Sequence, residues 1–423
     1  MKINLNGLDK EIYYEKLDNG LEVYVVPYPD KKNYSVSYFT KFGSNSTTFI
    51  PEGEKEYIKV PDGIAHFLEH KCFETEEGVD PFTFFSKSGT DANAFTSFVE
   101  TAYVFNGTNN LLPNLDFLLT YVNSPYFTDE NVEKEKGIIG EELRMYEDNP
   151  YEQLLKNMRE ATYINDPYQV EIGGSVESIQ DITKDYLYRT YNTFYKPSNM
   201  VLLVAGNTTM EEVLEVCKNN KKLMSRSNGE PIRVKDFSEP KEVRDKERVF
   251  NFPVNVNKFG YTIKIERPKD IDIFKYDVML DIILEMLFGN SSLFKDNILK
   301  TNLCQHFSAQ TDLTKYYDSI VFMGESDKPK EVVNYINDTL DINSLDEDTF
   351  NRIKKVLISG FVNNIDDVDT TLYEIQAHII NYGKYYNDKL DILKNITYKE
   401  IIDLFNNLDL SNNSLVIMNK VEK

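Results

Sequence analysis

The sequence predicts an α+β protein with two homologous domains, each a mainly antiparallel sheet packed with helices. One observation is a polar segment, residues 224–246, which contains a glycine and two prolines and divides the 423-residue chain near its middle. The other is that both halves end alike, with a helical pattern followed by an apolar strand, at 199–206 and at 413–418. We therefore expect an N-terminal domain at 1–223, a linker at 224–246 and a C-terminal domain at 247–423.

The first half opens with a strand pair at 12–27, because Asn19-Gly20 separates two runs rich in tyrosine and valine. Asn-Gly between such runs is a strong hairpin signal. A further strand is expected at 35–42. Helical periodicity follows at 63–73, 81–88, 111–123, 129–147, 150–162, 183–194 and 209–220.

The second half begins with two expected strands, at 248–253 and 258–265. Helical patterns come after them at 271–288, 328–340, 346–364, 369–382 and 397–406. In both halves, strands are followed by helices, which favours two domains of the same fold.

Charge and composition exclude several classes of protein. The net charge of -22 argues against a nucleic-acid-binding protein. No segment has the roughly 20 apolar residues of a membrane helix, and the N-terminus lacks the apolar core of a signal peptide. The three cysteines lie far apart, as expected in a reducing compartment, so we predict a cytoplasmic protein without membrane contact.

Two of the four histidines, His66 and His70, lie four residues apart with Glu69 between them. On a helix this spacing places both imidazoles on one face, where they can share a cation. Asp62 is positioned to cap this helix. The surrounding residues are mostly apolar, so the helix is expected to be buried, and buried imidazoles need partners. A zinc ion would satisfy both.

A catalytic zinc has three protein ligands and one open position. Glu142 is the best candidate for the third, because the helix at 129–147 carries an apolar stripe beside which Glu135 and Glu142 lie two turns apart. Glu141 falls on the opposite, solvent face. Glu135 is then placed to orient a ligand or hold a proton. Glu69 need not bind metal and is placed as the general base.

With these motifs the chain resembles the pitrilysin/insulinase family of zinc metallopeptidases, the inverzincins, whose zinc motif is His-x-x-Glu-His. The resemblance covers the whole chain and is strongest over 60–206. Residues 63–70 are similar to the family's zinc helix and 135–142 to its second motif. The resemblance implies His66, His70 and Glu142 as ligands of one Zn²⁺ per chain, with Glu69 as base.

Residues 89–96 also resemble a family motif, a strand whose free edge pairs with an extended peptide. The resemblance implies substrate contacts at Asn93, Ala94, Phe95 and Thr96. From the residues alone, a plain sheet strand is an equally good interpretation.

The second half departs from the family pattern of an arginine and a tyrosine seven residues apart, which contact the substrate. Lys300 and Phe307 stand at the corresponding positions here. Phenylalanine has no hydroxyl, and lysine lacks the planar fork of arginine. The resemblance implies paired subunits, so we expect the zinc-bearing subunit of a heterodimer whose paralogous partner supplies the missing pair.

Three alternatives stay open. They are a self-sufficient homodimeric peptidase, a zinc- or peptide-binding subunit without turnover, and a metal-dependent hydrolase of a non-peptide substrate. The intact Glu69 favours an enzyme, and the strand at 89–96 favours peptides. The sequence specifies neither the physiological peptide nor the cleavage site.

Overall fold

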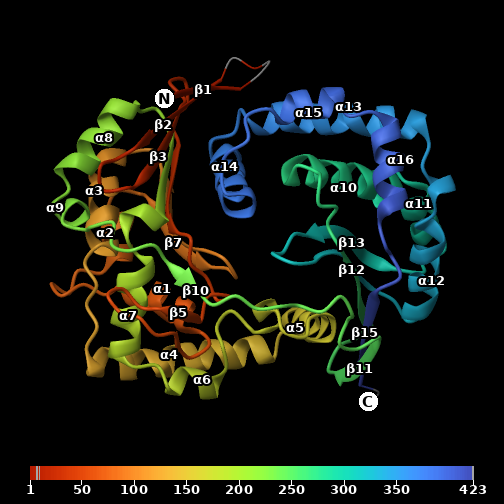
Figure 1. Ribbon diagram of the computed structural model, residues 1–423, viewed down its shortest axis with the longest axis horizontal. Helices are drawn as coiled ribbons and strands as arrows, with labels where there is room; N and C mark the ends of the chain where they lie inside the picture. Colours follow the sequence, from red (N-terminus) through yellow and green to blue (C-terminus); the bar gives the residue numbers. More distant parts are fainter. Residues whose placement is uncertain (6–7, 9, 422–423) are drawn as a thin grey trace. The chain divides into compact units, whose positions relative to one another are not determined.

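The computed structural model describes residues 1–5, 8 and 10–421 and divides into two compact units (Figure 1). Unit 1 comprises residues 1–144, 170–236 and 362–387, and unit 2 comprises 145–169, 237–361 and 388–423. No helix among the described residues is both long and apolar enough to pass through a membrane.

Unit 1 is built on a seven-stranded sheet in the order β1-β2-β3-β9-β4-β8-β7. Its strands are β1 (Lys2–Asn4), β2 (Glu11–Lys16), β3 (Glu22–Pro27), β4 (Tyr34–Thr40), β7 (Asp91–Thr96), β8 (Thr101–Gly107) and β9 (Met200–Gly206). All neighbours pair antiparallel except β3 and β9. Three short strands, β5 (Thr48–Ile50), β6 (Ile58–Lys59) and β10 (Arg233–Val234), form a small second sheet.

Helices cover both faces of the large sheet. Those of the first segment are α1 (Ile64–Cys72), α2 (Pro81–Ser86), α3 (Leu111–Val122) and α4 (Asp129–Glu147), and those of the second are α6 (Val176–Gln180), α7 (Lys184–Phe194), α8 (Met210–Asn219) and α9 (Lys221–Met224). One hydrophobic core joins one face of the sheet to helices that include α1, α3, α7 and α8. The opposite face packs against α14 (Val368–Tyr382), which lies alongside the strands in Figure 1.

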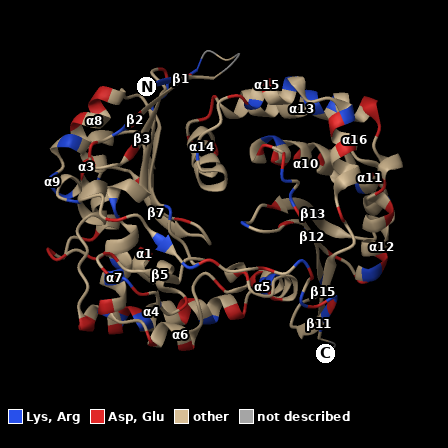
Figure 2. Ribbon diagram, viewed as in Figure 1, with Lys and Arg blue, Asp and Glu red and all other residues tan. Residues whose placement is uncertain are grey.

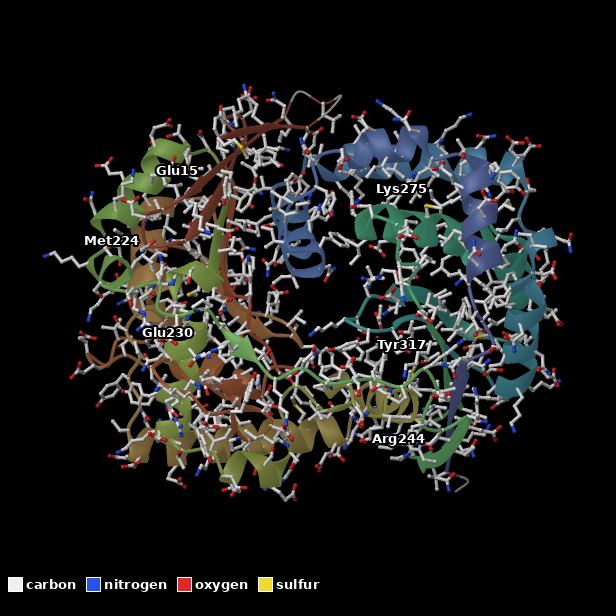
Figure 3. The ribbon with its side chains drawn as sticks, in the orientation of Figure 1. Glu15, Met224, Glu230, Arg244, Lys275 and Tyr317 are labelled. Carbon is white, nitrogen blue, oxygen red and sulfur yellow. The ribbon has the colours of Figure 1, made fainter. Side chains whose placement is uncertain are left out.

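Unit 2 contains a five-stranded sheet in the order β11-β15-β12-β14-β13. The strands are β11 (Glu247–Phe252), β12 (Lys258–Ile265), β13 (Gln305–Asp312), β14 (Asp318–Glu325) and β15 (Asn413–Lys420), with only β11 and β15 parallel. Its helices are α5 (Pro150–Thr162), α10 (Ile273–Phe288), α11 (Leu293–Lys300), α12 (Pro329–Thr339), α13 (Glu347–Asn364), α15 (Lys389–Asn395) and α16 (Tyr398–Asn407). Lys275 on α10, which is labelled in Figure 3, pairs with Glu400 on α16 at 2.6 Å.

The prediction of two mainly antiparallel sheets with helices is confirmed, with one parallel pair in each sheet. The units differ from the expected domains in two exchanged segments. Residues 145–169, expected in the first domain, pack in unit 2, where α5 lies on β12 and β15. Residues 362–387, expected in the second, pack in unit 1. Each exchanged helix buries apolar residues on the sheet it joins, which chain order does not reveal.

The segment expected as a linker, 224–246, is also more structured than its composition suggests. Its strand β10 pairs with β5 in unit 1. In unit 2, Glu239 accepts the backbone N–H groups of residues 164–166 and pairs with Lys264 at 2.6 Å, both side chains being fully buried. Acidic residues are spread over the helices of both units, including α4 and α8 of unit 1 (Figure 2).

Candidate metal centre

Helix α1 begins at a backbone-to-backbone contact rather than at a side-chain cap. Gly63 is the N-cap residue, with a φ of 92°, and no side chain caps the helix, so the expectation for Asp62 is wrong. The carbonyl oxygen of Asp62 instead accepts a hydrogen bond from Ser178 Oγ at 2.8 Å. A Cβ atom at position 63 would lie 2.3 Å from the carbonyl oxygen of Gly173. The loop around Gly173 therefore fixes the start of the helix.

The helix presents its two histidines together, as expected from their spacing. Most of its other side chains are buried in the core of unit 1, which fixes the orientation of the helix. The rings of His66 and His70 have centroids 4.7 Å apart, and their side chains are 12% and 25% exposed. Both Nε2 atoms point toward helix α4.

Helix α4 brings Glu142 to both histidines. Glu142 Oε1 lies 3.7 Å from His66 Nε2, and Oε2 lies 3.5 Å from His70 Nε2. One ligand atom from each residue falls within 4.8 Å of the others, and no other such group occurs among the described residues. Glu141 is 79% exposed and pairs with Arg144 on the outer face of α4. The structure thus places at the histidines the carboxylate that helix geometry favours.

The donor set fits zinc. Tetrahedral coordination with bonds of about 2.0–2.2 Å places ligand atoms about 3.3–3.6 Å apart, close to the two observed separations. Burial, together with the neighbouring His70, lowers the pKa of His66 to about 4, so its imidazole is neutral and keeps a lone pair for a metal. The buried Nδ1 of His66 has no hydrogen-bond partner.

Glu135 contacts His70 at the ring nitrogen Nδ1. Its Oε1 lies 3.0 Å from His70 Nδ1, and the side chain is only 7% exposed. Burial alone would raise the pKa of Glu135, but the hydrogen bond with His70 lowers it below its usual value. A carboxylate that accepts from Nδ1–H leaves Nε2 as the free ligand atom, which is the arrangement found around many metal-bound histidines.

Glu69 lies on α1 between the two histidines in sequence. Its side chain is buried, and burial raises its pKa, although the hydrogen bond from Thr96 opposes the shift. Thr96 Oγ1 donates to Glu69 Oε2 at 2.6 Å. The second oxygen, Oε1, is thereby left for a proton.

Thr96 is the last residue of β7, which is the edge strand of the large sheet. Strand β7 pairs with β8 on one side, and no strand among the described residues pairs with its other side. Asn93 is exposed, while Ala94 and Phe95 are half-buried against the core. The strand thus ends at a contact with Glu69, on the helix that carries both histidines.

The remaining predicted residues lie outside this cluster. Lys300 in unit 2 is 69% exposed and pairs with Asp296 within α11. Phe307 is 8% exposed and packs against the rings of Phe288, Phe294 and Phe322. Its burial leaves little of the ring for contact with a peptide.

Sequence reasoning missed two features of the site. Lys71, directly after His70, is fully buried at the junction of α1 and α4. A lysine among apolar residues on a buried helix is the signal that could have found it. The other feature is the loop at Gly173, whose contact with α1 spans more than a hundred residues and leaves no local pattern.

The sequence model of the insulinase family, peptidase family M16, matches residues 49–175, and that of the peptidase M16 inactive domain matches residues 181–357. The protein named uncharacterized zinc protease YmfH of Bacillus subtilis is 42% identical over 295 residues, which cover 69% of this chain and 68% of that protein. The chain belongs to peptidase family M16, and its resemblance to the pitrilysin/insulinase family is confirmed.

Two further relatives extend the comparison. The crystal structure of an M16-like peptidase from Alicyclobacillus acidocaldarius has a TM-score of 0.91 and 29% identity, covering 99% of this chain and all of that one. The beta subunit of bovine mitochondrial-processing peptidase is 28% identical over 174 residues, which cover 40% of this chain and 36% of that protein. The names of these relatives support a peptidase, and the name of the YmfH protein includes zinc.

Proposed function

We propose that this protein is a zinc-dependent endopeptidase that cleaves peptides or short unfolded segments. The observation that carries the proposal is the junction of three parts: the group His66, His70 and Glu142, the base Glu69, and the edge strand β7. Thr96 joins the last two, because it ends the strand and donates to the base at 2.6 Å. One zinc per chain is expected, held by the three ligands.

The chain's own groups account for binding and proton transfer. The free edge of β7 offers backbone N–H and C=O groups to an extended peptide, which pairs through its main chain and so tolerates many sequences. A zinc ion at the three ligands would supply Lewis acidity, lowering the pKa of water and polarising the scissile carbonyl. Glu69 Oε1 takes the proton of the attacking water and delivers it to the leaving amine nitrogen. Thr96 holds Oε2 and fixes the carboxylate during both transfers.

We further propose that the chain is the zinc-bearing subunit of a heterodimer, working in the cytoplasm. The side chains of unit 2 that correspond to the family's arginine and tyrosine are the exposed Lys300 and the buried Phe307. Neither provides a bidentate cation or a hydroxyl. A paralogous chain is the expected source of these groups.

The test is zinc content together with cleavage of a fluorogenic peptide library, by the chain alone and mixed with a paralogue encoded beside it. Glu69→Gln should keep zinc and lose turnover. Glu142→Gln should lose zinc, whereas the matched variant Glu141→Gln, on the exposed face of the same helix, should change neither. Retained turnover in Glu69→Gln would remove the mechanism.

The two assemblies give different results in the same assay. Activity only in the mixture supports the heterodimer. Full activity of the chain alone, unchanged by the paralogue, supports a homodimeric peptidase and refutes the need for a partner. Zinc binding without turnover in either sample would indicate a binding subunit.

A further inference from the structure

Lys71 is a buried cation whose surroundings the proposed mechanism does not explain. It follows His70 on α1, and its side chain is 0% exposed. A buried ammonium is costly unless it is paired and hydrogen-bonded. Its Nζ donates to the carbonyl oxygen of Asn131 at 3.2 Å and pairs with Glu74 Oε1 at 2.6 Å. Glu135 Oε2 lies 3.9 Å away.

These contacts connect the two helices that carry the metal ligands. Asn131 and Glu135 lie one turn apart on α4, whereas Lys71 belongs to α1. Glu135 is therefore held from two sides, by Lys71 near Oε2 and by His70 Nδ1 at Oε1, 3.0 Å away. The ammonium limits rotation of the carboxylate, and the carboxylate fixes the plane of the imidazole.

We propose that Lys71 is a positioning residue of the zinc site, acting through Glu135 on His70. The role rests on the proposed zinc-binding function. The positive charge offsets part of the negative charge of Glu135, and the contact with Asn131 sets α1 in register with α4. His70 Nε2 is thereby aimed at Glu142 before any metal arrives, so zinc binding does not have to order the imidazole.

The competing interpretation is that Lys71 only forms a structural ion pair with Glu74, because the distance from Lys71 to Glu74 is shorter than that to Glu135. Glu74 is 33% exposed and follows two residues after the end of α1, so its ion pair with Lys71 involves no second helix. Glu135 is 7% exposed and belongs to α4. The two interpretations predict different effects on metal affinity, because only the contact with Glu135 reaches a ligand.

The experiment measures the zinc dissociation constant of the full chain by competition with a chromogenic chelator, and the stability of the metal-free chain by circular dichroism. Lys71→Met should weaken zinc binding about 10–100-fold, the usual effect of losing a group that orients a ligand. Lys136→Met is the matched control. Lys136 is 8% exposed and adjacent to Glu135, but its ammonium pairs with Glu133 and the carbonyl of Gln180. It should change zinc affinity less than about 3-fold.

A double-mutant cycle separates positioning from general destabilisation. In a Glu135→Gln background, Lys71→Met should weaken zinc binding by no more than about 3-fold, because Glu135, through which Lys71 acts on His70, is already altered. Glu74→Gln should leave affinity unchanged. Additive effects of Lys71→Met and Glu135→Gln, or a loss of affinity in Glu74→Gln equal to that in Lys71→Met, would overturn the proposal.

Three further outcomes are decisive. If Lys71→Met does not fold, Lys71→Gln replaces it, since the amide keeps a donor for Asn131 and removes the charge; wild-type affinity in that variant would overturn the role of the charge. A wild-type chain that binds no zinc would overturn the proposed function together with this role. A wild-type chain that binds zinc, with Lys71→Met equal to it, would overturn the positioning role alone.

Discussion

Glu100 should make the stability of unit 1 depend on pH in a way that one substitution removes. It lies in the turn between β7 and β8, and its Oε2 accepts a hydrogen bond from Gln376 Nε2 of α14 at 2.8 Å. Gln376 in turn accepts from Ser37 Oγ of β4 at 2.7 Å. Burial raises the pKa of Glu100 from 4.5 to about 7, although the hydrogen bond from Gln376 opposes the shift.

The direction of the pH dependence of stability follows from the raised pKa of Glu100. The folded state binds the proton more tightly than the unfolded state, so the stabilisation is complete below pH 4.5 and is lost as pH rises toward 7. At 1.36 kcal/mol per pKa unit, the loss is about 3 kcal/mol. Glu100→Gln keeps the acceptor for Gln376 and removes the charge, so its free energy of unfolding should lack this decline.

The assay is urea unfolding of the metal-free chain at several pH values between about 4.5 and 8, followed by circular dichroism and tyrosine fluorescence. The free energy of unfolding of Glu100→Gln minus that of the wild type should grow by about 3 kcal/mol over this range. Glu77→Gln, at an exposed position, is the matched control and should show no trend. A difference for Glu100→Gln that stays constant within about 1 kcal/mol would refute the reasoning.

Two other substitutions test the architecture. Gly63→Ala should destabilise the chain and weaken zinc binding, because the new Cβ meets the Gly173 carbonyl; Gly53→Ala has a similar positive φ but open space, so it should cost only about 1–2 kcal/mol and leave zinc affinity intact. Thermal unfolding measures the stability of the two variants and a metal-binding assay measures their zinc affinity. Equal zinc affinities of Gly63→Ala and Gly53→Ala would contradict the contact with Gly173. Glu239→Leu should lower the free energy of unfolding by about 3–5 kcal/mol by leaving the Lys264 ammonium buried without its carboxylate. Adding Lys264→Met should recover part of the loss in the same urea assay, and no recovery would argue against the pair.

The elements that the sequence predicts best are those whose signal is local. The helices at 129–147 and 150–162 have the predicted bounds, because an apolar stripe marks the first and Asn149-Pro150 starts the second. The strands β8 and β14 were not predicted, since short apolar runs resemble buried helix segments in periodicity. Strand β13 was not predicted because its residues are mostly polar, so no alternation of apolar residues marks it.

The residues of the site also differ in whether their positions follow from a local pattern. The preference for Glu142 over Glu141 depends only on the geometry of one helix, and Glu142 does lie at the histidines while Glu141 is exposed. Thr96, the partner of Glu69, comes from a strand end, and Lys71 contacts Asn131 and Glu135 of a neighbouring helix in addition to the nearby Glu74. No spacing along the chain reveals the contacts with other elements. The burial of Phe307 likewise depends on three rings brought together by folding.

The placement of α14 has a consequence for how the protein is made. The last strand of the large sheet ends at Gly206, but the helix that covers its second face begins at Val368, about 160 residues later. At about 5–20 residues per second, a ribosome needs roughly 10 to 30 s to reach it. During that time the nascent chain carries an uncovered apolar surface. We therefore expect chaperones to engage the nascent chain in the interval between the synthesis of Gly206 and that of Val368.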